Sequence, residues 1–248
     1  MSVIFSRDKK VCHITINRPE KRNALSIQLC HELLGAFRQA ESDSNVSVVL
    51  LDAAGPSFSS GMDLGEILDP DFARQADVHE ELLTIGSHYS KPIIAAVQGA
   101  VFGGAVALVA SAHIVVAAED AQFCSTEIHI GMWPYVAYRA IASAIGERRA
   151  TELALTGRVA SAAEAYEWGL AHRIVPADQL SETATRLAVQ VAAFDADALS
   201  QGLLFIQQSH RLHPEEAGLV ARQFRDRAFA SDVFRSAVQS FLAKRDSK

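Results

Sequence analysis

An uncharged apolar stretch in the middle of the chain constrains the fold most. Residues 92–118 contain no Asp, Glu, Lys or Arg, and 27 such residues are long enough to cross a bilayer. Gln98-Gly99 and Gly103-Gly104 interrupt the stretch, and β-branched residues flank an alanine-rich piece between Ala105 and Ala112. Although glycine is also common in transmembrane helices, this pattern favours a buried strand, a turn, a helix and a second strand. We therefore predict a core segment and no membrane span.

Composition narrows the class of protein. The chain has 248 residues, of which 49% are hydrophobic and 21% charged, as in globular proteins. A net charge of −6 without a long basic stripe argues against a nucleic-acid partner and a cationic membrane surface. Cys12, Cys30 and Cys124 lack metal-ligand spacing, and their odd number disfavours a disulfide framework. Because no signal sequence is recognised either, we expect a reducing, cytoplasmic location and no metal site.

Strands and helices alternate early and helices follow alone. Strands are predicted at 3–7, 11–17, 46–52 and 122–125, and a helix capped by Ser26 at 27–42. Further helices are predicted at 138–144 and 147–156. A Ser161–Glu164 capping box predicts the start of another helix, and four more helical pieces are predicted between 177 and 244. An irregular, largely helical stretch at 69–89 is expected to form a lid or pocket wall. The pattern predicts an α/β core over 1–190 followed by a helical C-terminal region over 191–248.

Several familiar active-site signatures are missing. The chain has no G-x-S-x-G, and His79-Glu80-Glu81 lacks the second histidine of H-E-x-x-H. The segment from Gly99 to Gly104 is neither G-x-G-x-x-G nor a P-loop. A serine-hydrolase elbow, a zinc-protease helix and a dinucleotide or ATP fold are therefore not indicated.

Two glycine turns are candidates for binding an anionic oxygen. Gly103-Gly104 comes directly before the predicted alanine-rich helix, and Ser60-Gly61-Met62 ends a loop that follows a predicted strand. Glycines at such places leave backbone N–H groups free to face a ligand, and two of them would form an oxyanion hole. The alternative is that these glycines only permit tight turns and close packing.

Glu127 is the third candidate. It lies in an apolar, glycine-bounded segment, where partial desolvation would raise the pKa of its carboxyl as a proton shuttle requires. The alternative is an exposed glutamate at a helix start after Ser125-Thr126.

Four segments, in order, resemble one known family. They are Asn17-Arg-Pro-Glu-Lys-Arg-Asn-Ala-Leu25, Phe58-Ser-Ser-Gly-Met-Asp-Leu64, Lys91-Pro-Ile-Ile-Ala-Ala-Val-Gln-Gly99 with Gly103-Gly104, and the region from Ala162 through Glu167-Trp-Gly-Leu170 to Pro176. Their order and spacing resemble the crotonase, or enoyl-CoA hydratase/isomerase, superfamily. The resemblance implies a crotonase-like α/β spiral of β-β-α units, trimerisation through the C-terminal helices, and often a dimer of trimers. It implies acyl-CoA thioester substrates and no cofactor beyond the CoA of the substrate.

The resemblance also assigns roles to residues. The N–H groups of Met62 and Gly104 would hold the thioester oxygen, with Glu127 as the third catalytic group, and Asp63 matches a structural position. The implied substrate and CoA contacts are Arg22, Ala24, Leu25, Met62, Asp63, Leu64, Gly65, Gly103, Gly104, Phe241 and Lys244. The last two resemble a terminal F-x-x-K that can reach a CoA, sometimes that of a neighbouring subunit. Solvated surface charge is the alternative for Arg22 and Lys244.

Departures from the family pattern point to one reaction. Ala107 stands where hydratases of the family carry their first glutamate, and Pro134-Tyr-Val-Ala-Tyr138 replaces P-G-A-G-G. A single carboxylate, Glu127, suits a 1,3-proton shift better than hydration, so we predict an enoyl-CoA isomerase. A hydratase, another crotonase-type reaction and a non-catalytic CoA-binding protein remain alternatives. Three further pocket residues are candidates for another reaction: Glu66, His129 and Tyr135. The alternatives are a surface position for Glu66, a satisfied core or rim position for His129 and a packing role for Tyr135.

Overall fold

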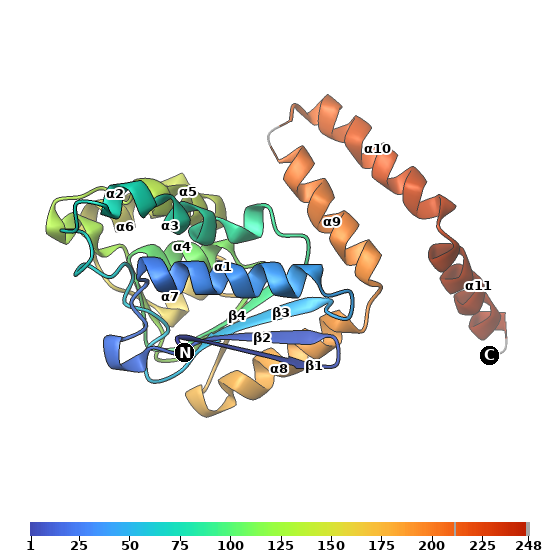
Figure 1. Cartoon of the computed structure of the whole chain (residues 1–248). Coiled ribbons are helices and arrows are strands. Elements are labelled where there is room, and N and C mark those ends of the chain that lie inside the picture. Colours follow the sequence, from blue (N-terminus) through green and yellow to red (C-terminus); the bar gives the residue numbers. More distant parts are fainter. Residues whose placement is uncertain (211, 247–248) are drawn as a thin grey trace. The chain divides into compact units, whose positions relative to one another are not determined.

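The computed structural model describes residues 1–210 and 212–246, and the chain divides into two compact units, 1–194 and 195–248. The division predicted from the sequence, after residue 190, falls inside helix α8. A six-stranded sheet in the order β1-β2-β3-β4-β6-β9 runs through the first unit (Figure 1). Its strands are β1 Val3–Asp8, β2 Val11–Ile16, β3 Val48–Ala53, β4 Ile93–Val97, β6 Ile114–Ala118 and β9 Arg173–Val175. β1 and β2 form the predicted antiparallel hairpin, and the other neighbours pair in parallel.

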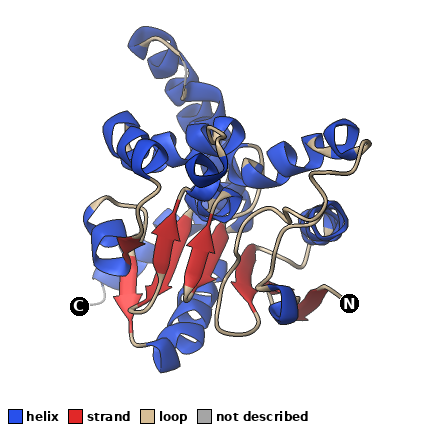
Figure 2. Ribbon diagram, turned by 90° about the vertical axis from the view of Figure 1, so that its left-hand side faces the viewer, coloured by secondary structure: helices blue, strands red, loops and turns tan. Residues whose placement is uncertain are grey.

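Helices cover both faces of this sheet (Figure 2). Val49 and Leu51 of β3 belong to the core shared with α1 (Ile27–Ser42), α4 (Gly104–Ser111) and α5 (Tyr135–Ile145). Val48 and Leu50 point to the opposite face, where they pack with α8 (Leu180–Ala192). Because successive strand side chains alternate between two buried faces, the central strands are apolar throughout.

The uncharged stretch forms the predicted strand, turn, helix and strand. It contains β4, α4 and β6, and also a short strand that was not predicted, β5 (Ala100–Phe102). β5 belongs to a second sheet, β5-β7-β8, with β7 at Gln122–Cys124 and β8 at Ala160–Ser161. Within the described ranges no single helix is long and apolar enough to cross a membrane, and one bent pair, 177–192 with 196–209, meets the criteria only when joined.

The remaining elements of the first unit are short. They are α2 (Phe72–Gln75), α3 (Asp77–Leu83), α6 (Glu147–Thr156), α7 (Ala162–Glu167) and the 3-10 turns η1 (Pro19–Lys21), η2 (Ile85–Ser87), η3 (Thr126–Ile130) and η4 (Ala177–Gln179). The Ser161–Glu164 capping box and the Ser26 cap are both present. Helix α5 begins at Tyr135, earlier than the predicted 138, and Pro134 is its N-cap residue.

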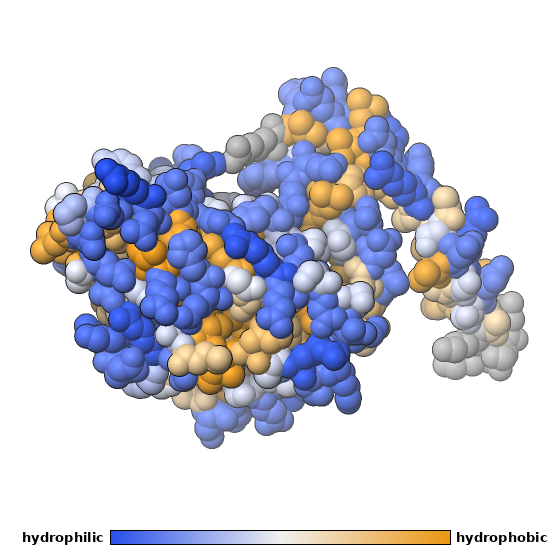
Figure 3. Space-filling model, viewed as in Figure 1, coloured by the Kyte–Doolittle hydropathy of each residue, from blue (hydrophilic) through white to orange (hydrophobic). Residues whose placement is uncertain are grey.

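The second unit consists of α9 (Ala196–Ser209), α10 (Pro214–Ala230) and α11 (Asp232–Asp246). Helices α9 and α10 meet through Phe205 and Phe224, whose ring centroids are 5.8 Å apart. Apolar side chains remain exposed along these helices (Figure 3), and Phe241 is 69% exposed. Lys244 falls within α11, but its side chain lies outside the described part of the structure.

Candidate active site

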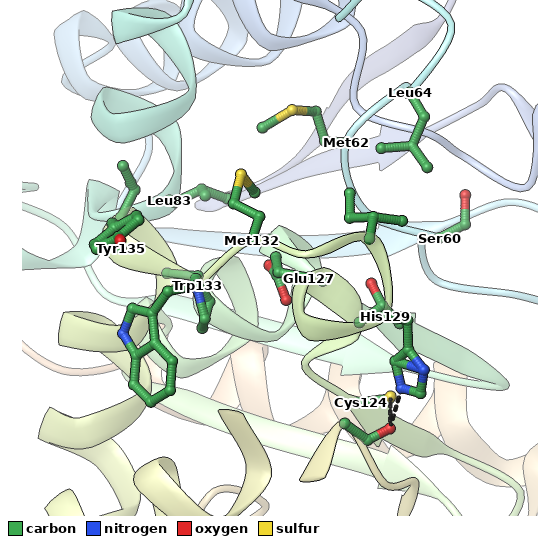
Figure 4. Close-up of a pocket in the computed structure, with 18 of the residues that line it drawn as sticks. Ser60, Met62, Leu64, Leu83, Cys124, Glu127, His129, Met132, Trp133 and Tyr135 are labelled. Atoms are coloured by element: carbon green, nitrogen blue, oxygen red, sulfur yellow. Dashed lines mark hydrogen bonds between the residues drawn. The ribbon is translucent and has the colours of Figure 1, made fainter. Parts of the chain in front are cut away.

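An apolar cavity of about 490 Å³ opens in the first unit (Figure 4). Its walls come from the loop after β3, the end of α3, the start of α4, the segment after β7, the start of α5 and the end of α6. Seven predicted site residues line it: Met62, Leu64, Gly103, Gly104, Glu127, His129 and Tyr135. Arg22, Ala24, Leu25, Asp63, Gly65, Glu66 and Ala107 are not among its lining residues.

Three short parallel segments bring Gly61, Gly103 and Glu127 close together. Strand β5 pairs in parallel with β7 on one side, and Val101 forms a parallel bridge with Ser59 on the other. The chain therefore leaves all three segments at the same edge, into Gly61, Gly103 and Glu127. Ligands of parallel sheets bind where the carboxyl ends of neighbouring strands diverge.

The two glycine turns touch each other closely. A Cβ on Gly61 would lie 2.6 Å from the carbonyl oxygen of Phe102, which only a shift of backbone would relieve. Gly103 has φ +56°, and a Cβ there would lie 3.1 Å from Thr126 Oγ1. Gly61 therefore requires glycine for conformation and for space, and Gly103 requires it for conformation. Close packing and backbone conformation together account for the glycines at 61 and 103. The same packing places the backbone of the next residues, Met62 and Gly104, beside the cavity.

The backbone N–H groups of Met62 and Gly104 have no acceptor among the described residues. Leu25 N–H donates to the Gly61 carbonyl at 2.8 Å, and Asp63 N–H donates to the Leu25 carbonyl at 3.2 Å. This parallel bridge leaves the intervening Met62 N–H facing the other way. Gly104 is the first residue of α4, so its N–H precedes the first intrahelical bond. Neither group donates a hydrogen bond within the described ranges.

Glu127 is the buried carboxyl of the cavity. Its side chain lies in η3 with a residue exposure of 9%, so the exposed alternative is wrong. Oε2 is buried without a hydrogen-bond partner among the described residues, and Oε1 lies 3.6 Å from where a Cβ of Gly103 would be. Burial raises the pKa of Glu127 because the charged form is desolvated. The group is therefore a stronger base than an ordinary glutamate.

Two predicted acidic residues have partners away from the cavity. Arg18 Nη1 donates to Asp63 Oδ2 at 2.8 Å, and this hydrogen bond lowers the pKa of Asp63. The Ile27 N–H donates to Glu66 Oε2 at 2.8 Å, which places this carboxylate at the positive end of α1.

The predicted CoA-binding loop lies beside the first glycine turn. The Arg22 carbonyl accepts from Ser60 N–H at 2.9 Å, and Leu25 pairs with Met62. Ala24 and Leu25 are buried, whereas Arg22 is exposed, with φ +50°. Phe241 and Lys244 belong to the second unit. The CoA contacts remain predictions.

The sequence did not single out several wall residues. Leu83, Met132 and Trp133 line the cavity together with the predicted Tyr135, which is 74% exposed at the start of α5. Tyr138 instead packs beside Trp133 and bonds Thr151 through its hydroxyl at 2.8 Å. The large side chains after Gly131 were the signal in the sequence that could have identified this wall. Which of them face the cavity, however, depends on the residue at which α5 begins. In the described residues no three His, Cys, Asp or Glu side chains are grouped to hold a metal.

An apolar cavity that holds one buried carboxyl and two unpaired backbone donors has the composition of an enzyme active site. The enoyl-CoA hydratase/isomerase family model matches residues 6–248. "Probable enoyl-CoA hydratase echA8" of Mycobacterium bovis is 31% identical over 98% of this chain and 96% of its own. The trans-2-decenoyl-[acyl-carrier-protein] isomerase of Streptococcus mutans is 27% identical, covering 99% and 97%.

The fold agrees with these sequence relatives. The crystal structure of an enoyl-CoA hydratase from Mycobacterium smegmatis superposes with a TM-score of 0.94 and 26% identity, covering 98% of this chain and 97% of that one. The chain belongs to the enoyl-CoA hydratase/isomerase family, and its α/β architecture is the predicted crotonase fold.

Proposed function

We propose that the protein is an enoyl-CoA isomerase that moves a double bond with one glutamate. The observation that carries this proposal is that Glu127 is the only carboxylate among the residues that line the described cavity. By the family resemblance, Ala107 replaces the first hydratase glutamate. Its side chain is fully buried in α4 and supplies no acid to the cavity. A hydratase mechanism with two glutamates therefore lacks a partner for Glu127.

The reaction needs only the groups already present. The Glu127 carboxylate removes a proton from C2 of a 3-enoyl-CoA, and the electron pair moves into the thioester to give a dienolate. The N–H groups of Met62 and Gly104 hold the dienolate oxygen, where negative charge develops. Protonated Glu127 then returns the proton at C4, which leaves a conjugated 2-enoyl-CoA. The raised pKa of Glu127 suits a group that both accepts and returns a proton.

The test offers the purified protein a 3-enoyl-CoA and, separately, a 2-enoyl-CoA. We expect conjugated thioester to form from the first substrate, no water to add to the second, and kcat to fall about 10²- to 10⁴-fold in Glu127→Gln. Inactivity with both substrates in a folded protein would contradict the proposal and favour another acyl-CoA reaction or a non-catalytic role.

Hydration is the second candidate, because relatives that are 31% identical carry the name enoyl-CoA hydratase. Hydration would require the carboxyl of Glu127 alone to activate the water and to deliver a proton to carbon. Addition of water to the 2-enoyl-CoA that is lost in Glu127→Gln would establish it.

We also propose that the second unit assembles copies of this chain into a trimer or a dimer of trimers. Phe229, Val233 and Phe241 are each more than half exposed in its helices, and exposed apolar surface of this kind marks interaction sites. Light scattering of the intact protein measures the mass directly. A monomer at micromolar concentration would contradict this assembly.

A further inference from the structure

Among the described residues no hydrogen bond ties the carboxyl of Glu127 to another residue. Oε2 is buried without a partner among the described residues, and the carboxyl accepts a hydrogen bond from the backbone N–H of its own residue. Its location therefore depends on the backbone of η3 and on packing. A base that must reach both C2 and C4 of one substrate needs a fixed position, because a displacement of about 1 Å can reduce the rate 10²-fold.

Two side chains of this segment bind the same backbone oxygen. Cys124 Sγ donates to the Gly157 carbonyl at 3.0 Å, and His129 Nε2 bonds the same oxygen at 2.9 Å. Figure 4 shows the two bonds meeting at one atom at the foot of the cavity. Since a carbonyl only accepts, the proton must be on Nε2 of His129. The two donors belong to residues on either side of Glu127 in the sequence.

The end of α6 provides the acceptor. Gly157 is the C-cap of α6, where φ is +58°, and carbonyls at a helix C-terminus lack intrahelical donors. A Cβ on Gly157 would lie 2.2 Å from His129 Nε2 and 2.7 Å from Ile128 Cγ2. Glycine is therefore required for η3 to lie directly on the helix end. These bonds also satisfy a carbonyl that the helix dipole makes more negative.

We propose that Cys124 and His129 are positioning residues that hold Glu127 in place through the Gly157 carbonyl. The two bonds flank Glu127, which lies three residues after Cys124 and two before His129. Both donors also line the cavity that contains the carboxyl of Glu127. The consequence for the reaction rests on the proposed function, whereas the position of the carboxyl does not.

The test replaces His129 in the full-length protein. His129→Leu removes the donor at similar size, and His129→Gln places an N–H donor at comparable reach. We expect kcat for a 3-enoyl-CoA to fall about 10- to 100-fold in His129→Leu with a nearly constant KM. His129→Gln should recover most of this loss, and His31→Gln, an exposed position of α1, should leave kcat unchanged. Cys124→Ala should reduce kcat in the same direction.

A second measurement does not require turnover. The pKa of Glu127 is read from the carbon-13 shift of labelled glutamate carboxyls, with Glu127→Gln providing the assignment. Release of η3 should let the carboxyl reach water, so its pKa should fall in His129→Leu and return in His129→Gln. The other titratable side chains that line the cavity are Cys124, His129 and Tyr135, and burial raises the pKa of the Cys124 thiol.

The outcomes separate the two proposals. A folded His129→Leu protein with unchanged kcat and unchanged Glu127 pKa would overturn the positioning role. A pKa that falls in His129→Leu while the wild-type protein converts no 3-enoyl-CoA would support the positioning role and contradict the isomerase. If the substitution prevents folding, Cys124→Ala tests the same anchor, and an unchanged Glu127 pKa there would also overturn it.

Discussion

Replacing Gly103 with alanine tests how the turn shapes the site. The residue has φ +56° and ψ −132°, a conformation that is essentially restricted to glycine. The added Cβ would lie 3.1 Å from Thr126 Oγ1 and 3.6 Å from Glu127 Oε1. Backbone strain of this kind costs about 1–3 kcal/mol, to which the contact with Thr126 adds a displacement of a few tenths of an ångström.

The expected consequences are a less stable and much slower enzyme. For a unit of this size each kcal/mol lowers Tm by about 2–4 °C, so a strain of about 1–3 kcal/mol should lower Tm by roughly 2–12 °C. The displaced turn carries the Gly104 N–H, and the new methyl group faces Glu127, so kcat should fall about 10- to 100-fold. Tm is followed by circular dichroism, and kcat by the absorbance of the conjugated thioester.

Gly146→Ala is the matched control. Gly146 has φ +80° and ψ 153°, yet a Cβ there would meet nothing within 4 Å, and the residue does not line the cavity. It should lose comparable stability and keep its kcat. A folded Gly103→Ala protein with wild-type kcat, or an equal loss of kcat in Gly146→Ala, would refute the reasoning.

Three other substitutions test single interactions. Glu127→Gln should raise Tm at neutral pH. Burial raises the pKa of Glu127 above its ordinary 4.5, so its contribution to folding stability is fully present below that value and is lost as pH rises through the folded-state pKa. The increase in Tm should therefore vanish in acid. Asp63→Asn should lower the free energy of unfolding by about 1–2 kcal/mol at neutral pH, as measured in urea, because it breaks the 2.8 Å pair with Arg18. Since that pair lowers the pKa of Asp63, the difference in free energy of unfolding should disappear as pH falls through the folded-state pKa of Asp63. Ser161→Ala removes one bond of the capping box to Glu164 and should cost about 1 kcal/mol, visible as a Tm lower by about 2–4 °C, and an unchanged Tm would contradict the role of the cap.

Local signals made much of the fold predictable. Helix α1 begins where Ser26 caps it, because the Ser26 hydroxyl accepts from Leu29 N–H at 3.2 Å and needs no distant partner. The uncharged stretch 92–118 was assigned correctly because interrupted apolar runs fit buried strands better than one long helix. Burial of Glu127 followed from its apolar neighbours in sequence.

Features that depend on long-range packing were not predictable. Strand β5 has three residues, too few for any periodicity, and it exists because Ser59 and β7 pair with its two sides. Glu66 was a pocket candidate, but its carboxylate accepts from the N–H of Ile27, 39 residues away. The proposed anchor at Gly157 joins segments 28 residues apart. No motif reports such contacts.

The second, smaller sheet therefore determines the site more than any single motif does. Val101 pairs with Ser59 and with Phe123, so the loops that carry Met62, Gly104 and Glu127 must leave from adjacent parallel positions. Their separation is then set by strand spacing, about 4.8 Å between neighbours, and not by the lengths of the loops between them. The segment 72–83, which includes α2 and α3, contributes Leu83 to the cavity wall and carries none of these three groups. Differences in substrate among chains with this architecture should therefore arise in the cavity walls, while the proton-transfer geometry follows the sheet.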